Sequence, residues 1–197
     1  MELIVRLHRH GAETGGPHRI HFFPDPVAWT ECPESVQVLA RQRDRWQRGL
    51  FQSLTRHRKM LFNPKYGRVG MLAFPYFFFL EMLGPVIELG GYVSFTITIL
   101  AGRSDWVVVG AFLAVAVAFG GVLSLTAVAL EELSFRRYPR FGDLLKLFVL
   151  AALENVGYRQ MNTWWRVKGT ISALRGSQGW GKMTRKGFDA QKQEKPA

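Results

Sequence analysis

Cysteine and closely spaced acidic residues are scarce in this sequence of 197 residues. The one cysteine, Cys32, has no second cysteine to pair with, which excludes a disulfide-stabilised scaffold and a zinc site built from several thiolates. No two of the five aspartates are two positions apart, so the sequence contains no Asp-x-Asp motif. Glu2 and Arg6 interrupt the first apolar residues, so the opening of the chain does not resemble a secretory signal peptide.

Basic residues and long apolar runs are abundant, and they occupy different parts of the chain. Lys and Arg number 26 against 15 Asp and Glu, giving a formal net charge of +11, while 48% of the residues are hydrophobic. The long uncharged runs lie within residues 69–130 and after residue 144, whereas residues 1–68 and 165–197 are rich in Arg, Lys and His. This segregation excludes a uniformly soluble domain and predicts an integral membrane protein of mainly α class.

Three segments are candidates for membrane helices within the region 69–165. Residues 106–130 contain no charge and exceed the roughly 20 apolar residues that a span requires. Residues 69–101 are longer than one upright span and contain two prolines, which predicts a tilted, kinked or partly interfacial helix. Residues 144–165 carry three charged side chains, so this segment either spans the membrane or lies in its interface.

Two glutamates, Glu81 and Glu88, lie seven positions apart in the first of these segments and therefore share a helix face. A carboxylate at membrane depth normally faces the protein interior or a water-filled path. Two interpretations follow: a polar passage for a hydrophilic product, or protonated or paired glutamates that hold helices together.

The distribution of Lys and Arg predicts the orientation. Twelve of these residues precede residue 69, and the loop around Arg136 contains three more, whereas Arg103 stands alone between the first two segments. The positive-inside rule then places the N-terminal region and the Arg136 loop in the cytoplasm of a multi-pass inner-membrane protein. We also assign the basic tail, residues 166–197, to the cytoplasm.

The N-terminal 68 residues divide into two regions. In residues 1–32 the pattern predicts a helix over 1–10 that ends at Gly11, followed by a strand at 19–23, which is too little to bury a core alone. In residues 33–68 apolar residues recur at helical spacing with arginines between them. This pattern predicts basic amphipathic helices at the membrane surface, broken at Gly49 and at Asn63-Pro64.

Gln42, Arg45 and Trp46 are three and four residues apart in this amphipathic region, and they share one helix face. A guanidinium binds phosphate oxygens through its planar fork, an indole offers a flat apolar surface to a sugar ring, and an amide bonds hydroxyls. The trio therefore suits recognition of a sugar and a diphosphate. The alternative is a tryptophan anchored in the membrane interface among arginines that contact lipid phosphates.

The run Gln42-Arg43-Asp44-Arg45-Trp46 resembles the QxxRW motif of processive family-2 membrane glycosyltransferases, such as cellulose, hyaluronan and poly-N-acetylglucosamine synthases. Residues 23–35 look like the segment that precedes the motif in these enzymes, and residues 180–188 are similar to the tails of bacterial members. The resemblance extends over nearly the whole chain. It implies that Gln42, Arg45 and Trp46 contact the acceptor glycan and the donor diphosphate at the mouth of a membrane channel.

The sequence departs from this family in two elements of the catalytic GT-A domain. Asp-x-Asp, which holds Mg²⁺ or Mn²⁺ on the nucleotide sugar, is missing, and so is the Thr-Glu-Asp motif that supplies the base. The family's base motif runs directly into a helix similar to residues 1–9, so the chain is expected to begin just after the base. The resemblance then implies that residues 1–32 are a helix-strand remnant of a GT-A domain and that the chain alone is inactive.

These inferences define what we expect the chain to bind. The chain itself is expected to hold no metal or cofactor; nucleotide sugar, glycan acceptor and Mg²⁺ or Mn²⁺ are expected only with a complete catalytic domain, whether in a longer chain or a separate subunit. Membrane lipids are expected partners and nucleic acid is not, because the arginines adjoin membrane segments. The competing hypothesis is a non-catalytic basic scaffold that binds anionic lipids through charge alone.

Overall fold

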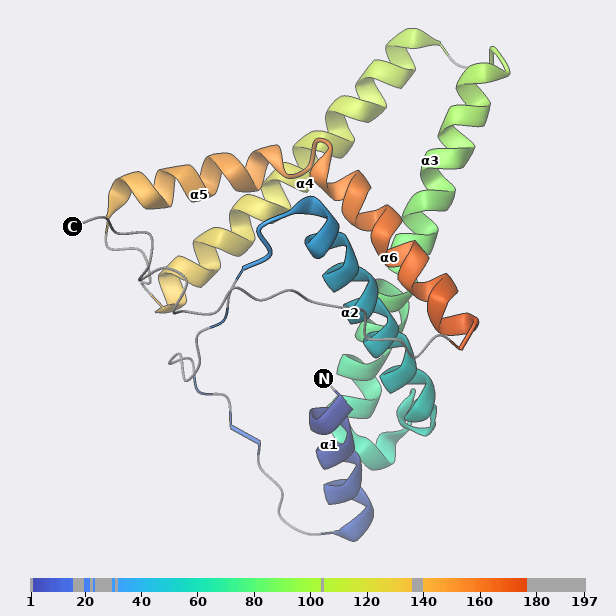
Figure 1. The fold of residues 1–197 in the computed structure, drawn as a ribbon, viewed down its shortest axis with the longest axis vertical. Helices are drawn as coiled ribbons and strands as arrows, with labels where there is room; N and C mark the ends of the chain where they lie inside the picture. The colour runs from blue at the N-terminus through green and yellow to red at the C-terminus, as the bar shows by residue number, and fades with distance from the viewer. Residues whose placement is uncertain are drawn as a thin grey trace, which may run out of the picture.

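Helices form all the regular structure in the described part of the protein. The structure is a computed structural model, and it describes residues 2–15, 20–21, 23, 30, 32–103, 105–135 and 140–176. Figure 1 shows two long helices that meet at one end of the molecule, with the remaining helices gathered where these two spread apart. The mainly α class predicted from the sequence is confirmed for these residues.

Helix α1 spans Glu2–Thr14 and is longer than predicted. The expected stop at Gly11 is wrong, because Gly11 is buried inside the helix, and Gly15 is the residue that follows it with a positive φ of 70°. The C-terminal turn of α1 is tied to a later segment: Arg9 Nε lies 2.8 Å from Glu13 Oε1, and the Tyr66 hydroxyl donates to the same oxygen at 3.2 Å. Two residues of the predicted strand at 19–23 lie outside the described residues, and the other three, Ile20, His21 and Phe23, have no regular structure.

Helix α2 spans Val36–Arg56 and carries the amphipathic pattern. Ser35 caps it by accepting a hydrogen bond from the Val38 amide at 3.3 Å. The predicted break at Gly49 is wrong, since one glycine costs a helix only about 1 kcal/mol and α2 is held by packing against α6. The predicted interruption at Asn63-Pro64 is confirmed: two short 3₁₀ turns, η1 (Arg58–Met60) and η2 (Pro64–Tyr66), follow α2.

The first long apolar segment, Val69–Leu100, has 32 residues and contains two stretches of π-helix. The π-helices η3 (Val69–Ala73) and η4 (Tyr76–Met82) precede α3 (Gly84–Leu100), which has Pro85 in its first turn. The irregularity predicted from the prolines is present, because wider turns and a proline both interrupt the α-helical hydrogen-bond ladder. The segment is long and apolar enough to cross a membrane.

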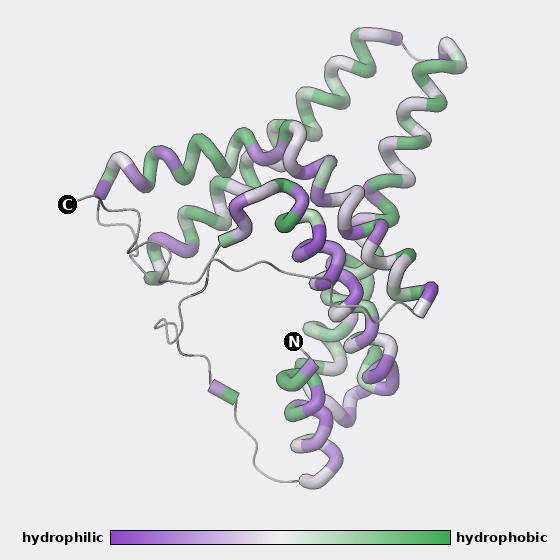
Figure 2. Tube along the Cα trace, in the orientation of Figure 1, coloured by the Kyte–Doolittle hydropathy of each residue, from purple (hydrophilic) through white to green (hydrophobic). Residues whose placement is uncertain are grey.

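The second long apolar helix, α4, spans Trp106–Phe135. Its 30 residues include the predicted 106–130 and also have the length and composition of a membrane span. Most of its side chains are exposed, with Val107 at 77% and Phe119 at 66%, which suits a helix solvated by lipid rather than by water. Figure 2 shows that α4 and α3 are largely hydrophobic along their length. Phe95 and Phe112 join the two helices with ring centroids 5.1 Å apart.

Residues 144–165 do not form one continuous helix. Helix α5 spans Phe141–Leu153 and α6 spans Tyr158–Leu174, and the turn between them ends at Gly157 with φ +85°. Thirteen residues of α-helix reach about 20 Å, which is less than the roughly 30 Å thickness of a hydrocarbon core. Alone, α5 is therefore too short to span, and the boundary drawn at residue 165 falls inside α6. Tail residues 177–197 lie outside the described residues.

Helix α6 contacts both α2 and the first long apolar segment. It runs beside α2 in the same direction and also packs on the first long apolar segment (Figure 1). The main hydrophobic core brings together buried side chains from α2, the 3₁₀ turns and the first long apolar segment: Leu50, Leu54, Met60, Tyr66, Phe74 and Met82. The amphipathic helix α2 thereby has one buried side and one accessible side.

Candidate functional site

The predicted trio lies at the border between these two sides of α2. Gln42 and Arg45 are half-buried, and Trp46 is 59% exposed. The next residue, Gln47, lies about 100° around the helix and is only 1% exposed. A large indole left this accessible, next to a buried amide, forms an aromatic surface on a helix whose other side is fixed in the core.

Arg43, which the sequence analysis did not single out, contacts this indole directly. Its guanidinium carbon lies 4.7 Å from the centre of the Trp46 ring, a cation–π contact. The same guanidinium donates from Nη2 to the Tyr158 hydroxyl at 3.2 Å. Arg43 therefore links the indole to the first turn of α6, and its spacing of three residues from Trp46 was the sequence signal for this contact.

Gln47 is the centre of a buried polar junction between three elements. Its amide nitrogen donates to the Met82 carbonyl oxygen at 3.0 Å and to Thr170 Oγ1 at 3.1 Å. Its amide oxygen accepts from Arg166 Nε at 2.9 Å. Both ends of the amide are thus satisfied, which is required of a polar side chain at this depth because an unpaired buried group costs about 1–3 kcal/mol.

Arg166 completes the junction by reaching the first long apolar segment. Its Nη2 atom lies 3.1 Å from Glu81 Oε2 and also donates to the backbone carbonyl oxygen of Glu81. One guanidinium therefore contacts a side chain of α2 and both acceptor groups of Glu81. The planar fork of arginine allows such simultaneous contacts, which a single lysine ammonium does not reproduce.

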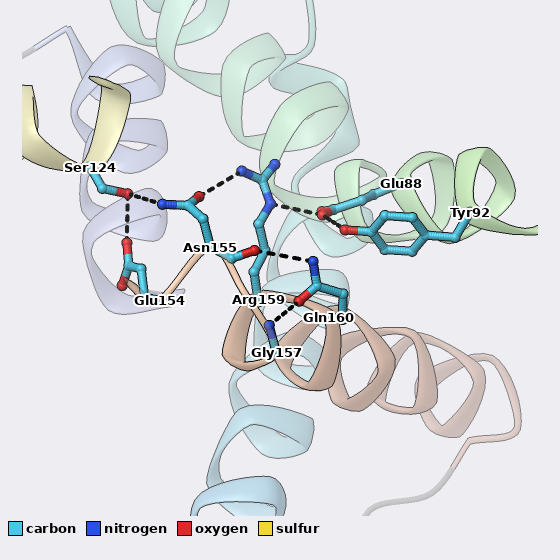
Figure 3. Close-up of polar contacts among 8 residues, drawn as sticks. All are labelled: Glu88, Tyr92, Ser124, Glu154, Asn155, Gly157, Arg159 and Gln160. Atoms are coloured by element: carbon cyan, nitrogen blue, oxygen red, sulfur yellow. Dashed lines mark hydrogen bonds and ion pairs between the residues drawn. The ribbon is translucent and has the colours of Figure 1, made fainter. Parts of the chain in front are cut away.

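A second polar junction lies where α3, α4 and the start of α6 meet (Figure 3). Arg159 Nε lies 2.8 Å from Glu88 Oε1, and the Tyr92 hydroxyl donates to the same oxygen. On its other side, Arg159 Nη1 donates to Asn155 Oδ1 at 3.4 Å. The arginine thereby connects α3 to the turn that precedes α6.

Asn155 carries this junction onward to α4. Its side chain, in a residue 6% exposed, donates to Ser124 Oγ at 3.3 Å, and Ser124 in turn donates to Glu154 Oε1 at 2.7 Å. Gly120 permits the approach, since a Cβ there would lie 2.4 Å from Asn155 Oδ1. Gly120 of α4 therefore accommodates the polar turn between α5 and α6.

Both glutamates of the first apolar segment are paired with arginines of α6. Glu81 and Glu88 are seven residues apart, and so are their partners Arg166 and Arg159, taken in the opposite direction along the chain. Of the two interpretations of these carboxylates, the structure shows ion pairs that connect helices. Arg166 pairs with η4 and Arg159 pairs with α3, so α6 is joined to both of these parts of the segment.

The remaining features of the described residues place limits on the chemistry. Within the described ranges, no three His, Cys, Asp or Glu side chains gather closely enough to bind a metal ion. An open, mainly apolar groove of about 730 Å³ lies between α4 and α5, and its lining includes Ser124, Glu154 and Tyr158 but none of Gln42, Arg45 and Trp46. The arrangement on α2 is therefore suited to binding through an exposed aromatic ring and cations.

Comparisons of the chain with protein families, with curated proteins and with solved structures found no match.

Proposed function

We propose that this protein is the acceptor-gate and membrane-channel portion of a processive family-2 glycosyltransferase, which transfers a sugar from a nucleotide-sugar donor to a growing polysaccharide. In this proposal residues 1–32 are the end of a GT-A domain, α2 forms the rim of the channel, and the two long apolar helices belong to its membrane part. The protein then lies in the inner membrane, with its N-terminal region in the cytoplasm.

The observation that carries this proposal is the position of Trp46. An indole 59% exposed on a helix that is packed firmly on its other side offers a ring surface to a ligand. Because Arg43 covers one face of the ring at 4.7 Å, the opposite face is the one to which a pyranose can stack. In the QxxRW pattern Gln42 precedes Trp46 by four residues and Arg45 directly precedes it, which sets an amide and a guanidinium beside this ring.

The three side chains divide the binding work by their chemistry. Trp46 gives the apolar platform for the terminal sugar of the acceptor, and the Gln42 amide bonds its hydroxyls. Arg45 provides a charge for the diphosphate of the donor, to which guanidinium binds more specifically than ammonium. These groups bind and orient, which brings the acceptor hydroxyl close to the reacting carbon.

Proton removal from the acceptor and stabilisation of the departing diphosphate are assigned to a catalytic domain outside this chain. Such a domain would supply the carboxylate base and the Mg²⁺ or Mn²⁺ ion. The chain alone is therefore proposed to bind glycan without transferring sugar, and to become part of a hexosyltransferase only together with that domain.

Binding of short β-linked glucose and N-acetylglucosamine oligosaccharides to the full chain in nanodiscs tests this proposal. We expect titration calorimetry to detect binding by the wild-type chain, and Trp46→Ala to weaken it at least about tenfold, in line with the 1–3 kcal/mol typical of an aromatic stacking contact. Trp164→Ala is the matched control, because Trp164 is a comparably exposed indole (51%) on α6.

A charge-conserving substitution separates this function from the lipid-binding hypothesis. Arg45→Lys should weaken binding of a nucleoside diphosphate, because the planar fork is lost, while binding to vesicles of anionic phospholipid stays unchanged. If the wild-type chain binds no oligosaccharide and no nucleoside diphosphate but does bind anionic vesicles, the glycan-binding proposal is wrong and the basic scaffold is the better description.

A further inference from the structure

The hydrogen-bond ladder of the first long apolar segment is open where η4 meets α3. Pro85 has no amide hydrogen, so the Glu81 carbonyl, four residues earlier, lacks its α-helical donor. The amide of Val86, which would serve the Met82 carbonyl, donates instead to Leu83 O at 2.9 Å. Two consecutive carbonyls are thus left without main-chain α-helical donors in a segment where unsatisfied backbone groups are costly.

Side chains from two other helices supply the missing donors. The Gln47 amide of α2 donates to the Met82 carbonyl at 3.0 Å, and the Arg166 guanidinium of α6 donates to the Glu81 carbonyl. Gln47 and Arg166 are themselves joined at 2.9 Å. The open ladder therefore binds α2 and α6 together through one continuous set of hydrogen bonds.

We propose that Gln47 and Arg166 are positioning residues for Trp46. The Glu81 and Met82 carbonyls, which lack α-helical donors, are the acceptors that hold these two side chains and thereby set the orientation of the indole. This inference rests on the proposed binding of glycan by Trp46 and adds the residues that control it. Neither Gln47 nor Arg166 is proposed to contact the ligand. Both act by fixing the rotation of α2 about its axis and its position along that axis.

The contacts on either side of Trp46 support this role. Before it, Arg43 connects α2 to Tyr158; directly after it, Gln47 connects α2 to Arg166 and to the first apolar segment. Between these points the helices approach closely, because a Cβ on Gly169 would lie 2.6 Å from the Asp44 carbonyl oxygen. Two polar attachments and one close backbone approach leave α2 little freedom to turn.

Fluorine NMR on the full chain labelled with 5-fluorotryptophan tests the position of the indole directly. The Trp46 resonance is assigned by its disappearance in Trp46→Phe. We expect Arg166→Lys and Gln47→Glu to shift or broaden this resonance and to leave that of Trp106, at the start of α4, unchanged. Arg166→Lys retains the charge but loses the fork, and Gln47→Glu retains the acceptor oxygen but loses the donor to Met82.

Oligosaccharide affinity provides the second measurement. We expect both variants to bind at least about tenfold more weakly than wild type, as displaced positioning groups do. Lys168→Gln is the matched control, since Lys168 is an exposed cation two residues from Arg166 on the same helix, and it should leave the Trp46 resonance and the affinity unchanged.

The outcomes separate this inference from the proposed function. A wild-type chain that binds no oligosaccharide refutes the function, while the Trp46 resonance still reports on positioning. An unchanged Trp46 resonance in both variants overturns the positioning role. So does a uniform shift of all tryptophan resonances with a lowered melting temperature, because that pattern indicates a general contribution to stability.

Discussion

Arg159 Nε lies 2.8 Å from Glu88 Oε1, and this ion pair repeats, one heptad away, the pair between Arg166 and Glu81. Two turns of α6 are thus matched to two turns of the first long apolar segment, running in the opposite direction. The repeat fixes the alignment of the two helices, since a shift of either by one turn would separate both pairs. Helix α6, placed between this segment and α2, thereby sets the position of α2 as well.

The Glu88–Arg159 pair should stabilise the protein more than an exposed pair does. In a double-mutant cycle with Glu88→Gln and Arg159→Gln, we expect a coupling free energy of about 1 kcal/mol in detergent or nanodiscs, as found for polar contacts between membrane helices. The cycle with Asp143→Asn and Lys146→Gln is the control, because that pair is exposed and 3.6 Å apart and should couple by less than about 0.5 kcal/mol. Equal coupling free energies in the two cycles would contradict the prediction that the Glu88–Arg159 pair is more stabilising than an exposed pair.

Pro85→Ala should reduce the cost of losing Arg166. In the wild-type background, Arg166→Gln removes a charged donor from the Glu81 carbonyl and from Gln47, and we expect a loss of about 1.5–3 kcal/mol in the free energy of unfolding. Alanine at position 85 restores an amide hydrogen for the Glu81 carbonyl, so the same substitution should cost about 1 kcal/mol less there. Denaturant unfolding of the four proteins measures this difference, and strictly additive effects would refute the explanation.

Glycine-to-alanine substitutions at two positions should have opposite effects on thermal stability. Gly169→Ala introduces a Cβ that would lie 2.6 Å from the Asp44 carbonyl oxygen, and we expect a loss of about 1–3 kcal/mol from overpacking. Gly49→Ala meets no atom within 4 Å in a helical position, and we expect a gain of about 0.5–1 kcal/mol. Melting curves followed by circular dichroism test both, and destabilisation by Gly49→Ala would show that α2 needs flexibility there.

The contact between α1 and η2 should depend on acid pH. The hydrogen bond from Arg9 holds the pKa of Glu13 below its ordinary value, and the Tyr66 hydroxyl adds to this effect. A carboxylate with a lowered folded-state pKa contributes stability above its unfolded pKa of about 4.3, and this contribution disappears as the pH falls through the folded value. As the pH is lowered from 7 to 3, the melting temperature should therefore fall less steeply for Glu13→Gln than for wild type. Parallel curves would show that the Glu13 carboxylate does not contribute to the pH dependence of stability.

Local patterns were sufficient to predict the elements whose burial or composition is uniform along the chain. The uncharged run from Trp106 to Leu130 identified α4, and helical spacing of apolar residues identified α2. Gly49 was misinterpreted because propensity favours a break by only about 1 kcal/mol, and the packing of α2 on α6 outweighs that. Packing of this kind depends on residues more than a hundred positions away, which no local window contains.

The sequence allowed prediction of only one partner in each ion pair of the polar junctions. Glu81 and Glu88 were identifiable as carboxylates that require an explanation, because charge is rare in apolar segments. Their partners were not, since Arg159 and Arg166 are two of many arginines and their pairing is set by the fold. Gln47 lies beside the motif residues and has an ordinary polar side chain, so only its burial in the structure reveals its role.

The separation of 119 residues between Gln47 and Arg166 has a consequence for biogenesis. At about 5–20 residues per second, a ribosome needs roughly 6–24 s to synthesise the intervening chain. During that interval both long apolar segments are synthesised, and the Gln47 amide oxygen has not yet met its Arg166 donor. The face of α2 that carries Trp46 therefore reaches its final contacts only after α6 has been synthesised.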